Sequence, residues 1–221
     1  MRPAQHVASL AAASLSLTTI ALIAPASAVE PVASSSELKL SSYSNVVRYG
    51  DSAYLYADVR DLTSGYGIYE TGTIRVQQSV AGGAWTDTPL TAPGGYKSFQ
   101  VKPKATTSFR LVFSGGTNSR GVAYAPSTSA PVTYKVQRTG KYSASGRRVT
   151  VKLNPKAKNK KLVFKVSKTR DGKYKTYKSV RTNSRGKASI TGPKGLRYWK
   201  VVVKKDAAFT DAVYQFSAYL R

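Results

Sequence analysis

Short stretches in which polar and apolar residues alternate recur along most of the chain. Residues 53–59 alternate small or apolar side chains with Tyr and Asp, which is the period-two pattern of a half-buried strand. We expect seven strands in the first half, at 37–40, 53–59, 73–77, 84–86, 96–101, 108–113 and 130–136. About seven short antiparallel strands in roughly 100 residues are typical of an immunoglobulin-like sandwich.

The second half of the chain repeats this pattern. The best match places 198–203 on 108–113, at a separation of 90 residues. Four other segments of the second half match segments of the first: 148–153 matches 53–59, 162–166 matches 73–77, 171–174 matches 82–85, and 185–188 matches 94–97. Residues 213–220 form the last expected strand of the second copy. We therefore predict an all-β fold of two tandem immunoglobulin-like β-sandwiches, residues 29–136 and 137–221, with about seven antiparallel strands each.

The first 28 residues have the pattern of an export signal. Arg2 supplies a positive start, residues 7–24 are largely apolar, and Ala26-Ser27-Ala28 offers the small side chains of a cleavage site. The alternative is an uncleaved anchor, because 18 residues approach the length that spans a bilayer. Five Ser and Thr in 7–24 favour cleavage. We expect a secreted protein, extracellular or loosely held at the cell wall, with no membrane segment in the mature chain.

Removal of residues 1–28 would leave a chain without His, Cys or Met, because His6 and Met1 are the only such residues. Nucleophilic catalysis by His or Cys and zinc sites built on those ligands would then be excluded. Each sandwich would also have to be stable without disulfides. The composition therefore predicts neither cofactor nor catalytic residues.

Three motifs of the first half carry a resemblance to a known family. They are Tyr49-Gly50 before a buried strand, the turn Gly82-Gly83-Ala84-Trp85, and Lys102-Pro103-Lys104-Ala105-Thr106-Thr107-Ser108-Phe109-Arg110 leading into an apolar strand. These motifs resemble the bacterial immunoglobulin-like modules that are common in secreted actinobacterial proteins. The second half departs more, with Tyr174 where Trp is usual. The resemblance implies a spacer or binding module, and it carries no active site with it.

Without His and Cys, acidic residues are the remaining candidates for catalysis or metal binding. Asp58, Asp61 and Glu70 lie around the loop 62–69 and are the candidates for a carboxylate pair or for Ca²⁺ ligands. The spacing of Asp58 and Asp61 lacks the dense alternation of a calcium loop, and acids at strand ends usually cap turn amides. We therefore expect no enzyme and no metal site.

Charge divides the two halves sharply. Residues 29–136 contain ten Lys and Arg against seven Asp and Glu, a net of +3, whereas residues 137–221 contain 24 against three, a net of +21. Strand alternation directs part of this charge outward onto one sheet face, which predicts an anion-binding surface. Its members are Lys156, Lys158, Lys160, Lys161, Lys165, Lys173, Lys175, Tyr198, Lys200 and Lys204.

Two functions follow as hypotheses. In the first, the basic second module docks on an anionic polymer such as teichoic acid, an acidic glycan or extracellular DNA, because such charge density is otherwise self-repelling. Solubility and protection of sheet edges are the simpler alternative for the lysines. In the second, the protein is a secreted inhibitor or adhesin that contacts an extracellular protein or a carbohydrate through tyrosines of the first module, namely Tyr54, Tyr56, Tyr66 and Tyr69.

Overall fold

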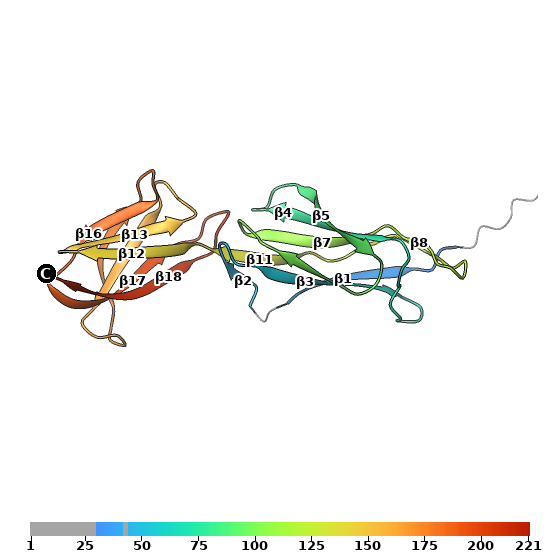
Figure 1. The fold of residues 1–221 in the computed structure, drawn as a ribbon, viewed down its shortest axis with the longest axis horizontal. Helices are drawn as coiled ribbons and strands as arrows, with labels where there is room; N and C mark the ends of the chain where they lie inside the picture. The colour runs from blue at the N-terminus through green and yellow to red at the C-terminus, as the bar shows by residue number, and fades with distance from the viewer. Residues whose placement is uncertain (1–29, 42–43) are drawn as a thin grey trace, which may run out of the picture. The chain divides into compact units, whose positions relative to one another are not determined.

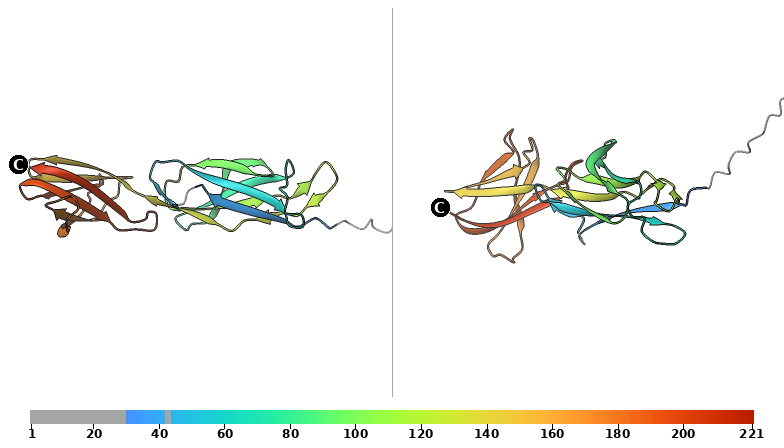
Figure 2. Two further views of the ribbon diagram at one scale, coloured as in Figure 1. Left: turned by 90° about the horizontal axis from the view of Figure 1, so that it is seen from below. Right: turned by 45° about the vertical axis from the view of Figure 1, so that its right-hand side comes forward.

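The computed structural model describes residues 30–41 and 44–221, and this part of the chain contains strands and loops but no helix (Figures 1 and 2). The predicted signal peptide lies outside the described residues, and so do His6 and Met1. The all-β prediction is confirmed. Residues Pro31–Arg221 cluster as one unit.

The first sandwich is built from the strands that precede residue 138. They are β1 (Ser34–Leu40), β2 (Val46–Arg48), β3 (Ala53–Asp61), β4 (Thr73–Val80), β5 (Trp85–Pro93), β6 (Lys97–Val101), β7 (Thr107–Phe113), β8 (Gly116–Thr117), β9 (Ala123–Tyr124), β10 (Ser127–Thr128) and β11 (Val132–Gln137). One sheet has the order β1-β3-β6, and the other has the order β2-β11-β7-β4-β5 with β10 on β7. The pair β2–β11 is parallel, so one strand departs from the expected antiparallel arrangement.

The second sandwich contains seven strands, all of them antiparallel to their neighbours. They are β12 (Thr139–Ser145), β13 (Arg148–Asn154), β14 (Lys161–Ser167), β15 (Lys175–Arg181), β16 (Lys187–Thr191), β17 (Gly195–Val203) and β18 (Ala212–Leu220). A three-stranded sheet, β12-β13-β16, faces a four-stranded sheet, β15-β14-β17-β18.

The strand orders show that the second sandwich repeats the first. Strands β12, β13 and β16 take the places of β1, β3 and β6, and β15, β14, β17 and β18 take those of β5, β4, β7 and β11. A side-chain contact repeats as well: Arg110 lies 4.5 Å from the Trp85 ring centre, and Lys200 lies 4.2 Å from that of Tyr174. The internal repeat inferred from the sequence is therefore a structural repeat.

Alternation along the strands builds one core in each sandwich. In β7 every second residue is buried, from Thr107 to Phe113, and in β17 the same holds for Trp199, Val201 and Val203. Burial of an aromatic or branched aliphatic side chain stabilises a fold by about 1.5–3 kcal/mol, so such stripes largely determine which face of each strand points inward. In β14, Leu162 and Phe164 are buried in the same way, and Val166 is partly buried.

Two strands of the second sandwich, β12 and β15, do not show the alternation of polar and apolar residues. β12 is almost entirely exposed and has the sequence TGKYSAS, and β15 is exposed except at Val180. Both lie at a sheet edge, where only one neighbour and little of the core constrain the residue types. Backbone pairing with β13 and β14, rather than burial, makes them strands.

The loop between β17 and β18 is anchored by backbone hydrogen bonds to residues that precede β12. The amide of Thr106 donates to Ala208 (2.7 Å), and the amide of Thr210 donates to Val136 (2.8 Å). Phe209 is buried, and the guanidinium carbon of Arg138 lies 3.6 Å from its ring centre. These contacts fix the loop that carries Asp206.

Candidate functional site

The outer face of the sheet β15-β14-β17-β18 carries two lysines directly opposite each other. Lys165 on β14 pairs in register with Lys200 on β17, between the pairs Phe164–Val201 and Val166–Trp199, in which only Val166 is partly exposed. Side chains in such positions lie about 5 Å apart at Cβ, and like charges there are destabilising. We call Lys165 and Lys200 the lysine row of the four-stranded sheet. Lys161, the first residue of β14, and Lys204, which directly follows β17, are exposed.

The equivalent row of the first sandwich is neutral and hydrogen-bonded. Gln77 takes the place of Lys165, and Arg110 takes the place of Lys200. Arg110 Nε donates to Gln77 Oε1 at 2.8 Å, and Gln77 Nε2 donates to Asp87 Oδ1 at 2.9 Å. The neighbour of Lys165 at the position of Asp87 is Thr176, which brings no negative charge. The same place in the fold is therefore balanced in one copy and cationic in the other.

A second set of lysines lies on the opposite sheet, and the sequence analysis did not find it. Lys141 on β12 pairs with Lys152 on β13, which pairs with Lys187 on β16. All three are exposed. We call them the lysine row of the three-stranded sheet. Only the register of three strands shows this alignment, so the cationic surface covers both sheets rather than one face.

Few acids are available to neutralise these rows. Residues 137–221, all of which the structure describes, contain only Asp171, Asp206 and Asp211. Asp206 accepts from Lys160 Nζ at 2.8 Å and from Arg138 at 3.0 Å, and these two are the only cations of this range in an ion pair. Burial alone would raise the pKa of Asp206, but the hydrogen bonds from Lys160 and Arg138 outweigh it and hold the pKa below its ordinary 3.8.

The predicted anion-binding residues differ in how far they are exposed to solvent. Lys156, Lys158, Lys161, Lys173, Lys175 and Lys204 are exposed, whereas Lys160, Lys165, Tyr198 and Lys200 are half-buried. Lys160 is directed to Asp206 and to the carbonyl of Lys205, so its charge is already compensated. The remaining lysines of this set have no ion pair within residues 137–221, all of them described.

A polar pocket of about 460 Å³ opens beside β16 in the second sandwich. Arg148, Arg181 and Lys187 line it, together with Thr150 and Ser189, whose hydroxyl groups are 2.8 Å apart. Three cations beside two hydroxyl groups form a surface suited to a phosphate, sulfate or carboxylate group. The pocket continues the lysine row of the three-stranded sheet through Lys187.

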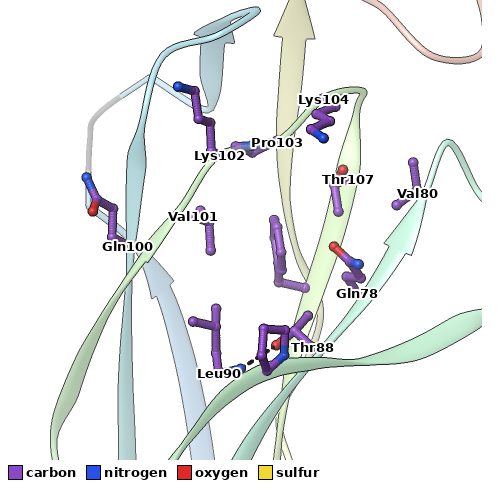
Figure 3. A pocket seen from close by; sticks show the side chains of 12 residues that line it. Gln78, Val80, Thr88, Leu90, Gln100, Val101, Lys102, Pro103, Lys104 and Thr107 are labelled. Atoms are coloured by element: carbon purple, nitrogen blue, oxygen red, sulfur yellow. Dashed lines mark hydrogen bonds between the residues drawn. The ribbon is translucent and has the colours of Figure 1, made fainter.

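The corresponding flank of the first sandwich holds an apolar pocket of about 500 Å³ (Figure 3). Val101 lines its middle, Lys102 and Lys104 lie at one end, and Thr88 and Leu90 lie at the other. The amide of Leu90 donates to the hydroxyl oxygen of Thr88 at 3.2 Å. Two lysines line this pocket among mostly neutral residues, whereas three cations are among the eight residues that line the pocket beside β16.

The four tyrosines singled out in the first sandwich are all exposed, Tyr66 most of all at 78%. Tyr56 stacks on Tyr96, with ring centres 6.0 Å apart, on the outer face of β1-β3-β6. Tyr69 packs against Gly95, where a Cβ atom would lie 2.6 Å from its ring. Tyr96, which the sequence analysis left out, therefore belongs with this aromatic group.

Of the three acids considered for catalysis or calcium, Asp58 and Asp61 are engaged locally, and Glu70 is exposed. Asp58 pairs with Arg60 at 2.7 Å. Asp61 accepts from the amides of Thr63 and Ser64, and the hydrogen bond from Ser64 is the main cause that lowers its pKa. Among the residues that the structure describes, no three His, Cys, Asp or Glu gather as metal ligands. No helix in the described part has the length and apolarity to cross a bilayer.

No family model matches the chain, and no curated protein matches it either. Among solved structures, a two-domain fibronectin type-III segment of chicken tenascin is similar, with 12% identity, 83% of this chain and 97% of that chain covered, and a TM-score of 0.47. Fibronectin(III)-like modules of Clostridium thermocellum CbhA share 13% identity over 83% and 94% of the two chains, with a TM-score of 0.27.

A tetra-tandem repeat from the extending region of a large adhesion protein is also similar, at 10% identity and a TM-score of 0.33. It covers 85% of this chain, which spans 49% of the adhesion segment. All three TM-scores are below 0.5, so the assignment of two tandem sandwiches rests on the strand order, the registers and the two cores described above.

Proposed function

We propose that this protein is a secreted, non-catalytic binding protein whose basic second sandwich docks on an anionic polymer of the cell surface or wall. Residues 29–136 would form the near-neutral module, and 137–221 would form the docking module. The polymer would carry phosphate, sulfate or carboxylate groups, as teichoic acids, acidic glycans and extracellular DNA do. Such a partner needs only a dense field of cations and no base-specific contacts.

The uncompensated lysine rows are the observation that supports this proposal most strongly. Lys165 opposite Lys200, and Lys141, Lys152 and Lys187 in line, place like charges side by side within a folded sheet. Each directly opposed pair costs roughly 0.2–1 kcal/mol relative to neutral residues. A bound polyanion would offset that cost and would release its counterions on binding. Lysines that served solubility alone would not need to face one another across strands.

The test is retention of the full chain on immobilised heparin during a salt gradient. A variant with Lys161, Lys165, Lys200 and Lys204 changed to Gln should elute at much lower salt than the unchanged protein. The control changes Lys39, Lys97, Lys102 and Lys104 of the first sandwich to Gln, so that the net charge falls equally. It should elute nearly as the unchanged protein does. Each lost contact should lower the slope of log affinity against log salt by about 0.7–0.9.

Equal loss of retention in the two variants would contradict the proposal, because total charge and not its arrangement would then govern binding. Retention that does not depend on salt would contradict it as well.

Exposed tyrosines of the first sandwich favour a second candidate, a protein-binding effector. Tyr66 and Tyr69 are 78% and 64% exposed in the segment between β3 and β4, and amphipathic rings of this kind are enriched at protein interfaces. This function would require a stoichiometric complex with one extracellular protein. Changing Tyr66 and Tyr69 to Ala should abolish that complex and leave heparin retention unaltered.

A further inference from the structure

A hollow of about 750 Å³ lies on the second sandwich near the edge strand β18. Tyr142, Arg170, Asp171, Tyr198, Gln215 and Ser217 line it, and Phe216 lies behind them. These residues come from β12, from the loop between β14 and β15, and from β17 and β18. Unlike the pocket beside β16, the hollow combines aromatic rings with one acid, one base and neutral polar groups.

Tyr142 provides a rigid aromatic surface. Its ring stacks on Phe216 with ring centres 4.2 Å apart and planes only 7° from parallel. Phe216 is 6% exposed and belongs to the core, whereas Tyr142 is 54% exposed. One face of the Tyr142 ring is therefore held against the core, and much of the rest of the residue is open. A ring held in this way loses little conformational freedom when a ligand stacks on it.

Hydrogen bonds also hold the polar groups in place before any ligand binds. Gln215 Nε2 donates to the hydroxyl oxygen of Tyr174 at 3.2 Å, and that hydroxyl donates to the carbonyl of Arg170 at 2.8 Å. A Cβ atom at Gly172 would collide with Ser167 and Thr169, so the loop packs closely on the sheet. These contacts hold Arg170 and Asp171 near β18, and they leave the Gln215 amide oxygen available.

Tyr198 and Ser217 face each other directly across β17 and β18. Together with Gln215, Arg170 and Asp171 they supply hydroxyl, amide, guanidinium and carboxylate groups, which offer both donors and acceptors. Arg170 and Asp171 are the only charged residues that line the hollow, and their charges are opposite. The set suits a neutral ligand rich in hydroxyl groups.

We propose that this hollow binds a pyranose ring of a neutral glycan. The C–H face of a β-linked glucose-type ring is flat and apolar and matches the Tyr142 ring, while its equatorial hydroxyl groups point sideways toward Asp171, Arg170 and Gln215. The Asp171 carboxylate disfavours a uronic acid or a phosphate at the same place. Lys200 of the lysine row pairs in register with Gln215, so the hollow adjoins that row. Binding of a neutral sugar there does not depend on the proposed docking to a polyanion.

The test is a titration of the full chain with cellohexaose and, separately, with chitohexaose, followed by ¹H–¹⁵N NMR. Amide shifts should concentrate at 142, 170–171, 198 and 215–217, and the dissociation constant should be nearly equal in 0.1 M and 0.5 M NaCl. Tyr142→Ala and Asp171→Asn should each weaken binding about three- to tenfold, which corresponds to about 0.6–1.4 kcal/mol. Tyr142→Phe should bind nearly as well as the unchanged protein, because the ring is kept.

Tyr219→Ala is the matched control, since Tyr219 is 67% exposed on β18, the strand of Gln215 and Ser217, but lies outside the hollow. It should leave affinity unchanged. The proposal is overturned if neither oligosaccharide shifts the named amides at millimolar concentration, or if Tyr219→Ala weakens binding as much as Tyr142→Ala. Binding that vanishes at 0.5 M NaCl would assign the hollow to the anionic polymer instead. Heparin retention reports on the lysine rows alone, so the two proposals can fail separately.

Discussion

The two sandwiches share one strand order but treat charge in opposite ways, as one row of residues shows. In the first, Asp87, Gln77 and Arg110 form a hydrogen-bonded and neutral line across three strands. In the second, Thr176, Lys165 and Lys200 occupy the same line, with two positive charges and no acid. The fold tolerates both rows because packing on the inner face, not the outer, determines the strand order. The outer face is therefore free to serve binding.

The largest expected effect tests whether the two cores are energetically separate. Leu162 and Ile74 are fully buried at equivalent strands, and truncation of either to Ala should cost about 2–5 kcal/mol. Trp85 lies in the first sandwich and Trp199 in the second, and these are the two Trp of the chain. Unfolding is followed by the fluorescence of one Trp at a time: Trp85→Phe leaves Trp199 as the reporter of the second sandwich, and Trp199→Phe leaves Trp85 as the reporter of the first. We expect Leu162→Ala to lower the midpoint of the Trp199 transition only. We expect Ile74→Ala to lower the midpoint of the Trp85 transition only. Equal movement of both by either change would show one cooperative unit and break the comparison.

A smaller effect concerns Asp206, the ion-paired acid of the second sandwich. Asp206→Asn should destabilise it by about 1–3 kcal/mol, because Arg138, only 8% exposed, would lose its charged partner. The folded pKa lies below 3.8, so this stabilisation is present above pH 3.8 and is lost as the pH falls through the folded pKa. The two proteins should therefore converge in stability in acid. Asp171→Asn removes the same charge without an ion pair, and it should change stability little.

The smallest effect tests the cost of the lysine row directly. Lys165→Gln recreates the residue of the first sandwich, and it should stabilise the second sandwich by about 0.2–1 kcal/mol at low salt. The gain should shrink at 0.5 M NaCl, where such charges are screened. Lys97→Gln in the first sandwich is the control. A loss of stability in Lys165→Gln would show that the row is not strained by its charge.

Only strands with a clear alternation of polar and apolar residues could be predicted from the sequence. Alternation over 53–59, 108–113 and 198–203 was enough to predict the main strands, their inward faces and the repeat. β12 and β15 lack that alternation because they lie at sheet edges. The lysine row of the three-stranded sheet depends on the register of β12, β13 and β16, which the separate strands do not reveal. Tyr142 lies on β12, so the hollow near β18 could not be predicted either.

The central claim is that the second sandwich is the docking module, and ligand-linked stability tests it most directly. A partner that binds only the folded form stabilises the part it contacts. Inorganic polyphosphate, added at low salt, should raise the midpoint of the Trp199 transition in proportion to the logarithm of its concentration and leave the Trp85 transition in place. A polyphosphate effect that is equal on both transitions, or absent from both, would contradict the account.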